Sequence, residues 1–167
     1  GGPVEVAIIG EPESLFQQGV RLAPPAQLLR AATSEGLVGL DPAGQVIPAI
    51  AERWIVTEDG LSYIFRLRDS TWPDGEEITA VDVPQQLRTA LSRLRGTSLG
   101  LDLGKIRDIR AMTGRVIEVR LTSPMPDLLR VLAQPELGFV KDGGGAGPMV
   151  MSRDEGSGGA RITALPP

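Results

Sequence analysis

The residue types that this chain lacks restrict its chemistry at once. None of its 167 residues is a cysteine or a histidine. The sequence therefore excludes a thiol nucleophile, a disulfide, a Cys/His zinc site and a Ser–His–Asp triad. A carboxylate-only site for calcium or magnesium stays open on composition, although no stretch has the ladder of Asp and Asn residues of a calcium loop. We expect neither a metal site nor a cofactor.

The remaining polar and aromatic residues favour binding over catalysis. Glu11 and Glu13 lie close in sequence, but alternate residues of an extended loop need not converge, so we interpret them as solvated. Trp54 begins a patterned strand and is assigned to the core, whereas Trp72 is open, with packing under a turn favoured over ligand stacking. Gly143–Pro148 lacks the Lys-Ser/Thr pair of a phosphate loop. An enzyme is the least favoured class.

Composition indicates a single globular domain with an aliphatic core. Hydrophobic residues make up 41% of the chain, charged residues 23% and aromatic residues only 4%. The net charge of -4 argues against a nucleic-acid partner, which needs a concentrated basic surface. No apolar run is long enough to cross a bilayer, so we expect membrane contact to be peripheral at most.

The hydrophobic pattern predicts an α+β domain with a mixed, mainly antiparallel sheet and flanking helices. Asp59-Gly60 and Thr113-Gly114 separate alternating segments, as is typical of hairpin turns. The expected strands are Val4–Ile9, Leu37–Leu40, Trp54–Thr57, Leu61–Arg68, Ile106–Met112, Arg115–Leu121, Met149–Met151 and Arg161–Leu165.

Helical spacing is clearest in the segment that follows Thr79. Thr79 and Asp82 resemble a capping box, although Pro84 leaves open whether Asp82 is itself the cap or the first turn is distorted. An apolar stripe then continues to Leu94. The expected helices are Ala26–Thr33, Asp82–Leu94 and Pro126–Ala133, with a short helical turn at Ile47–Arg53.

Many residues of these turns and strands stand in register with one protein family. They are Glu35, Gly36, Leu37, Asp41, Gly44, Pro48, Ala51, Glu52, Trp54, Asp59, Gly60, Leu61, Tyr63, Phe65, Leu67, Arg68, Asp74, Gly75, Thr79, Ala80, Asp82 and Val83. This pattern resembles the N-terminal part of the first lobe of the family 5 extracellular solute-binding proteins, the dipeptide- and oligopeptide-type receptors of ABC importers. Two features depart from the family pattern: Phe16-Gln17 follows Ser14-Leu15 where Asp-Pro is common, and the segment before Gly147 looks shortened.

The resemblance implies a substrate-binding component of an ABC transporter that captures a peptide or similar small solute between two lobes. It implies a periplasmic or extracellular location and an ABC permease as partner. Because receptors of this family are several times longer, we expect residues 1–167 to be a single domain, a truncated first lobe or a natural short relative, without the second lobe. An exposed half-cleft would favour a homodimer of the fragment.

The resemblance also implies where the solute binds. The loop after the first strand, Gly19, Val20, Arg21, Leu22 and Ala23, is expected to face the cleft, and Thr97, Ser98 and Leu99 form a second candidate segment. Arg21 would pair with an anionic ligand group, and a solvated loop arginine is the alternative. The alternative function is a regulatory module that uses the same lobe to sense a ligand or contact a protein.

Overall fold

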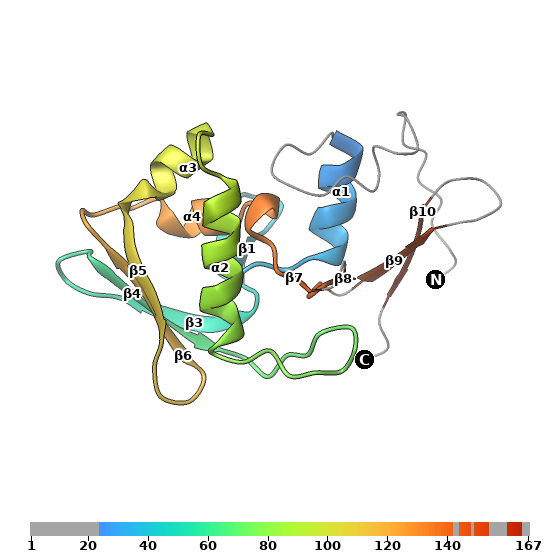
Figure 1. The fold of residues 1–167 in the computed structure, drawn as a ribbon, viewed down its shortest axis with the longest axis horizontal. Coiled ribbons are helices and arrows are strands. Elements are labelled where there is room, and N and C mark those ends of the chain that lie inside the picture. The colour runs from blue at the N-terminus through green and yellow to red at the C-terminus, as the bar shows by residue number, and fades with distance from the viewer. Residues whose placement is uncertain (1–23, 142–143, 148, 154–159, 165–167) are drawn as a thin grey trace.

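The computed structural model describes residues 24–141, 144–147, 149–153 and 160–164 (Figure 1). Within these residues the helices are α1 (Pro24–Thr33), α2 (Asp82–Arg93), α3 (Ser98–Asp102) and α4 (Leu128–Leu132), with 3-10 turns η2 (Leu103–Lys105) and η3 (Pro135–Leu137). The strands are β1 (Val38–Leu40), β2 (Val46–Pro48), β3 (Ala51–Val56), β4 (Ser62–Leu67), β5 (Ile106–Ala111), β6 (Val116–Leu121), β7 (Val140–Lys141), β8 (Gly144–Gly145), β9 (Met149–Arg153) and β10 (Ala160–Ala164). The predicted strand Val4–Ile9 lies outside the described residues.

A four-stranded antiparallel sheet in the order β3-β4-β6-β5 forms the centre of the fold. The β3–β4 and β5–β6 hairpins join side by side, because β4 pairs with β6 and Phe65 stands opposite Ile117. The alternation predicted for β4 is confirmed: Tyr63, Phe65 and Leu67 are buried in the core. All strand pairs of the described residues are antiparallel, and the predicted α+β fold class is confirmed.

The turns of the two hairpins form at the predicted Asp59-Gly60 and Thr113-Gly114 pairs. Gly60 and Gly114 adopt φ angles of 67° and 68°, a left-handed conformation that favours glycine. In the first turn the Asp59 carboxylate accepts hydrogen bonds from the Thr57 hydroxyl at 2.6 Å and the Leu61 amide at 3.0 Å. The Thr57 hydroxyl oxygen also accepts a hydrogen bond from the Ser62 amide at 3.0 Å. These bonds fix the register of β3 on β4.

The predicted capping box of Thr79 and Asp82 forms in the turn that leads into α2, whose own N-cap, Val81, makes no side-chain cap hydrogen bond. The Thr79 amide donates to Asp82 Oδ2 at 2.7 Å, and the Asp82 amide donates back to Thr79 Oγ1 at 3.4 Å. Pro84 is the third residue of α2 and therefore lies in its first turn, where proline is tolerated. Val83, Leu87 and Leu94 are buried, as the apolar stripe predicts.

The helical turn predicted at Ile47–Arg53 is wrong. These residues form β2 and the first half of β3, in which Ile47 pairs with Gly39 and Ala51 pairs with Leu67. Pro48 ends β2 and interrupts any helix, and the alanine and isoleucine residues around it suit either structure. Pairing with strands that lie elsewhere in the chain decides their conformation. The helix predicted at Pro126–Ala133 is confirmed but shorter, as α4.

The glycine-rich tail packs against the end of α1. A Cβ atom at Gly145 would lie 2.1 Å from the Thr33 carbonyl oxygen, and one at Gly147 would lie 2.5 Å from the Thr33 carbonyl carbon. Only glycine allows this approach, so these residues serve backbone packing. The predicted strands at Met149–Met151 and Arg161–Leu165 are confirmed as the antiparallel pair β9 and β10, which lies with α1 at the end of the molecule away from the hairpins (Figure 1).

Phe65 is the core residue whose loss should cost most stability. It is fully buried and contacts the rings of Trp54 and Tyr63, with centroid distances of 6.5 Å to each. We expect Phe65→Ala to lower the free energy of unfolding by about 3–5 kcal/mol. Urea denaturation followed by far-UV circular dichroism measures this. Ile55→Ala, at a side chain that is 64% exposed, is the control and should change it by less than about 0.5 kcal/mol.

Candidate functional site

Of the two segments predicted to bind a solute, the structure describes only the second. Gly19, Val20, Arg21, Leu22 and Ala23 lie outside the described residues, which begin at Pro24 with the first residue of α1. Thr97, Ser98 and Leu99 lie where α2 passes into α3. The start of α1 and this α2–α3 junction are at the same edge of the molecule, the upper edge in Figure 1.

Thr97 caps the start of α3 at this junction. Its hydroxyl oxygen accepts a hydrogen bond from the Gly100 amide at 3.0 Å, and the hydroxyl donates to the Leu94 carbonyl at 2.7 Å. It is therefore the N-cap of α3. A Cβ atom at Gly100 would lie 2.0 Å from the Leu94 carbonyl oxygen, so glycine is needed for α3 to fold back on the end of α2.

The neighbouring residues of the junction divide between the core and the solvent. Leu99 is half-buried and packs against the hydrophobic core. Ser98 is exposed. Of the three predicted residues, Ser98 is thus the one whose side chain neither caps a helix nor packs against the core. Their contact with a solute stays a prediction.

A hollow opens between α1, α2, η3 and β7. Its lining is Arg30, Gln86, Thr89, Ala90, Arg93, Glu136, Gly138 and Val140. Burial lowers the pKa of Arg30, the Glu136 carboxylate opposes this effect and the nearby Arg93 adds to it. An arginine side chain remains charged in proteins even so. The hollow therefore holds two guanidinium groups and one carboxylate.

Sequence reasoning did not find this hollow. Arg30, Arg93 and Glu136 come from three separate elements, and no local motif connects them. Only the folding of α1 and η3 against α2 brings them together. Their charge was the sole signal in the sequence, and charge alone does not distinguish a lining residue from a solvated one.

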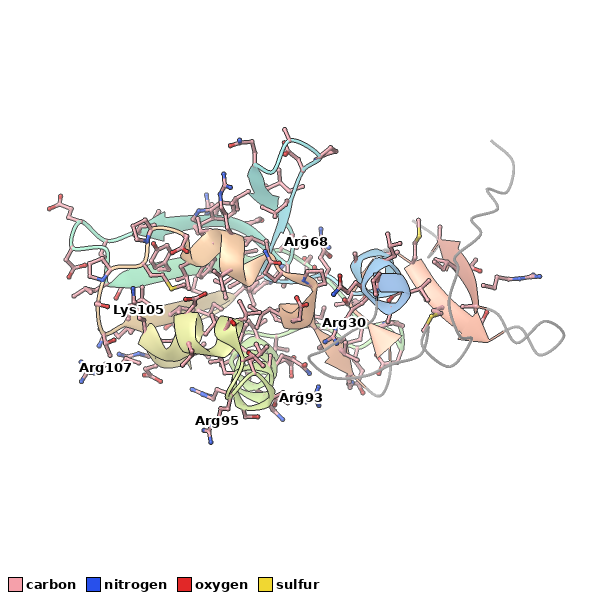
Figure 2. All side chains as sticks on the ribbon, turned by 90° about the horizontal axis from the view of Figure 1, so that it is seen from above. Arg30, Arg68, Arg93, Arg95, Lys105 and Arg107 are labelled. Atoms are coloured by element: carbon pink, nitrogen blue, oxygen red, sulfur yellow. The ribbon has the colours of Figure 1, made fainter. Side chains whose placement is uncertain are left out.

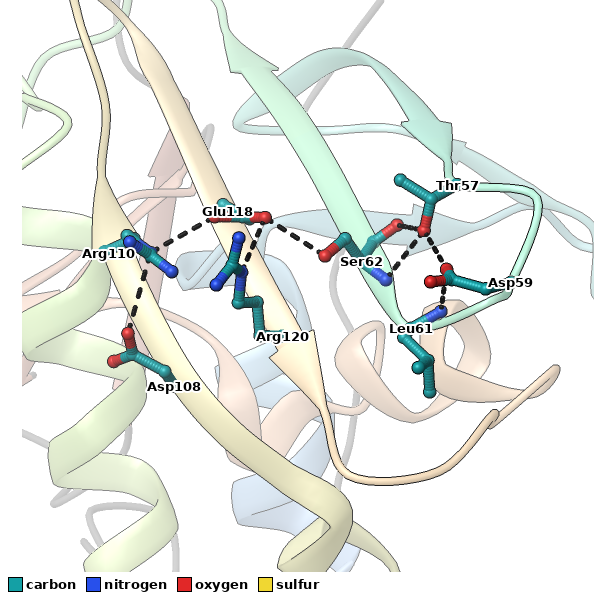
Figure 3. Close-up of polar contacts among 8 residues, drawn as sticks. All are labelled: Thr57, Asp59, Leu61, Ser62, Asp108, Arg110, Glu118 and Arg120. Atoms are coloured by element: carbon teal, nitrogen blue, oxygen red, sulfur yellow. Dashed lines mark hydrogen bonds and ion pairs between the residues drawn. The ribbon is translucent and has the colours of Figure 1, made fainter.

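A second polar cluster lies on the sheet face opposite the core, centred on Glu118 (Figure 3). The Glu118 carboxylate accepts hydrogen bonds from Ser62 Oγ at 3.0 Å and Arg120 Nε at 2.9 Å, and Arg110 Nε lies 3.1 Å away. Arg110 also approaches Asp108, at 3.6 Å. The side chains around it leave only 8% of the Glu118 side chain exposed.

The partners of Glu118 keep it ionised. Burial acts to raise the pKa of Glu118, but the hydrogen bonds from Arg120 and Ser62 and the charges of Arg120 and Arg110 together outweigh it, so the pKa is lowered. A general acid at neutral pH needs a raised pKa. The geometry therefore assigns Glu118 to holding the sheet face together, with β4, β5 and β6 each contributing a partner.

Both tryptophans are used for packing. Trp72, which the sequence left undecided, is 4% exposed within the core, so the packing interpretation is confirmed. Trp54 packs on the edge of the core against Phe65. Among the described residues, no three Asp or Glu side chains gather into a group that could hold a metal ion. No helix in this part of the chain is long and apolar enough to span a membrane.

Comparison with known proteins identifies the family. The profile described as "Bacterial extracellular solute-binding proteins, family 5 Middle" matches residues 45–159, which is more than half of the chain. The chain belongs to this family. The sequence resemblance centred on residues 35–83 is thereby confirmed.

Other family 5 proteins resemble it in sequence and in fold. The probable deoxycholate-binding periplasmic protein YgiS of Escherichia coli (strain K12) is 33% identical over 125 residues, covering 62% of this chain and 23% of that protein. The dipeptide-binding protein DppE of Bacillus subtilis (strain 168) is 31% identical over 117 residues, covering 60% and 22%. NikA from Brucella suis, solved with Fe(III)-EDTA, shares the fold with a TM-score of 0.73 at 24% identity, covering 84% of this chain and 31% of NikA.

The matches cover only a small part of the relatives' own length. The chain spans less than a quarter of the length of the curated relatives YgiS and DppE. Relatives of this family are binding proteins, several of them periplasmic and some named as parts of ABC transporters.

The lowered pKa of Glu118 predicts a pH-dependent contribution to stability. An ionised group with a lowered folded-state pKa stabilises the fold above its unfolded-state pKa of about 4.3, and this stabilisation is lost as the pH falls through the folded-state value. We expect Glu118→Gln to reduce the free energy of unfolding by about 1–3 kcal/mol at pH 7, because charge-assisted hydrogen bonds are lost. The difference from the unmodified protein should shrink below about pH 4.

Urea denaturation at a series of pH values measures this effect. Glu77→Gln is the matched control, because Glu77 is exposed and makes no side-chain ion pair within the described part of the chain. A Glu118→Gln deficit that stays constant from pH 7 to pH 3 would show that the charge of Glu118 does not stabilise the sheet.

Proposed function

We propose that this chain is part of the substrate-binding component of an ABC transporter and captures a peptide or similar small solute. The observation that carries the proposal is the family 5 match over residues 45–159. The names of its relatives support it, since they include dipeptide-, oligopeptide-, nickel- and glutathione-binding proteins. No observation in the described residues favours the regulatory alternative.

We infer that these residues form part of the first lobe and that the solute binds against its α3 edge. The proposed contacts are the loop of residues 19–23 and the junction residues Thr97, Ser98 and Leu99. Their support is that the first residue of α1 and the α2–α3 junction lie at one edge of the molecule (Figure 1). A second lobe would supply the opposite wall, and closure of the two lobes would bury the solute.

The remaining partners follow from this role. A receptor that delivers its solute to an ABC permease works outside the cytoplasm, in the periplasm or at the outer surface. Its task is reversible binding. A homodimer also stays a prediction. Exposed apolar side chains such as Leu101, which is 77% exposed, would favour it.

Solute binding should need more than one wall of the cleft. We expect the protein expressed from the complete reading frame that encodes these residues to bind at least one solute of a small panel: tripeptides, deoxycholate and a nickel–histidine chelate. Residues 1–167 alone should bind the same solute at least about 100-fold more weakly, because half of the polar partners are absent. Isothermal titration calorimetry on both proteins measures this.

The comparison separates two ideas. Tight binding by residues 1–167 alone would contradict the half-cleft, while leaving solute capture intact. Failure of the complete protein to bind any member of the panel, or unchanged uptake of the bound solute in a gene-deletion strain, would contradict the transport role itself.

The proposed loop has its own test in Arg21. If Arg21 pairs with the solute, Arg21→Ala should weaken binding by the complete protein about tenfold or more, because a charge-assisted hydrogen bond is lost. Arg161→Ala is the matched control, at an exposed arginine on β10. Equal solute affinities of the two variants would show that Arg21 does not contact the solute and is solvated.

A further inference from the structure

Four basic residues surround α3 and form a surface that we call the basic rim: Arg93, Arg95, Lys105 and Arg107. All four are exposed. Seen from above, they follow one another around α3 and the end of α2 (Figure 2). Between residues 93 and 107 the sole acidic residue is Asp102, so this segment has a net charge of +3, whereas the whole chain has a net charge of -4.

The basic rim differs from the arginines on the sheet. Arg66 pairs with Glu52, Arg110 and Arg120 pair with Glu118, and Arg115 pairs with Asp69. By contrast, no residue of the basic rim makes an ion pair with any residue that the structure describes. Each of these sheet arginines therefore faces a carboxylate, whereas the rim side chains have no such partner among the described residues and act on their surroundings.

The hollow described above continues the positive surface. Arg93 belongs to both, since it also lines the hollow together with Arg30. Figure 2 shows Arg30 on the side of Arg93 away from Lys105 and Arg107. Glu136 is the one carboxylate of the hollow lining. Arg30 and Arg93 thus place two guanidinium groups in one hollow, and their planar, forked donors suit a carboxylate.

We infer that the solute of this receptor carries a net negative charge and that the basic rim attracts its carboxylate. The inference rests on the proposed function, because Thr97, Ser98 and Leu99 lie within the same segment, between Arg95 and Lys105. Guanidinium groups hold carboxylates through paired donors and remain charged at every physiological pH. A cluster of one sign on an otherwise acidic protein also raises the local concentration of anions.

An anionic membrane surface is the competing occupant. The exposed Leu101 beside the basic rim would suit contact with lipid. However, α3 has only five residues, which is too short to present an extended amphipathic face. The structure therefore favours a small anion, and lipid binding becomes an outcome of the test.

The test measures charge selectivity on the protein from the complete reading frame. Gly-Glu-Gly, Gly-Gln-Gly and Gly-Lys-Gly differ in one side-chain charge at similar size, and deoxycholate is a non-peptide anion. We expect Gly-Glu-Gly to bind about tenfold more tightly than Gly-Gln-Gly, with Gly-Lys-Gly weakest. The variant Arg93→Gln/Arg95→Gln should reduce the preference for Gly-Glu-Gly over Gly-Gln-Gly to less than about threefold and should weaken deoxycholate binding by a similar factor.

The control is Arg53→Gln/Arg161→Gln, which removes two exposed arginines from β3 and β10. It should keep the preference, and thermal unfolding should show that both double variants fold. A rise in salt should reduce the preference in the unmodified protein and not in Arg93→Gln/Arg95→Gln.

Each other outcome overturns the inference in a recognisable way. Equal or tighter binding of Gly-Gln-Gly would show that the solute is not selected by charge, with solute capture unaffected. Equal loss for charged and neutral peptides would assign the basic rim to holding the protein together. Rim-dependent binding to vesicles of phosphatidylglycerol, without selectivity among solutes, would assign it to the membrane. Absence of any binding would overturn the proposed function as well.

Discussion

The pairing of β4 with β6 is the contact on which the rest of the structure depends. In this pairing Phe65 lies opposite Ile117, although the two strands are far apart in the chain. The pairing joins the two hairpins into one sheet. Everything between these strands, including α2 and α3, is thereby closed into a loop whose ends are fixed. Closing such a loop costs chain entropy, and the burial of Tyr63, Phe65, Ile117 and Val119 on one face offsets that cost.

The same register organises the opposite face of the sheet. Since side chains alternate along a strand, the pairing that buries Phe65 and Ile117 places Ser62 near Glu118 on the other side. Arg110 and Arg120 then pair with Glu118, and Arg110 also lies 3.6 Å from Asp108. The charged face is therefore a consequence of the core and contributes register specificity, because a slip of one residue would bury the arginines and expose the aromatic rings.

Charge is distributed unevenly over the molecule. The sheet face balances its arginines with carboxylates, whereas the α3 edge keeps four basic side chains without such partners among the described residues. The exposed ion pairs of this face add little to stability, whereas the covered Glu118 both stabilises the sheet and specifies strand register. No ion pair among the described residues ties the rim side chains of the α3 edge to the fold, which is why we propose this edge as the place that attracts an anionic solute.

Local sequence signals determined most of the secondary structure. Asp59-Gly60, Thr113-Gly114 and the Thr79–Asp82 box act within a few residues, so turn and cap chemistry follows directly from the order of residues. The alternation of β4 and the apolar stripe of α2 likewise identified the core faces. The lack of cysteine and histidine limits the chemistry of the chain whatever its conformation, because no arrangement of the backbone can supply a missing functional group.

Tertiary structure decided what depends on distant partners. Residues 47–53 became strands because β1 and β4 offered them pairing, although the alanine and isoleucine residues around Pro48 suit a helix as well as a strand. Glu118 has the sequence pattern of an exposed strand residue and is instead covered by three side chains from β4, β5 and β6. Arg30 and Arg93 meet in one hollow only because α1 docks near α2. Periodicity reports which face of a segment is apolar, but the identity of the segment that covers it is set by packing across the whole chain.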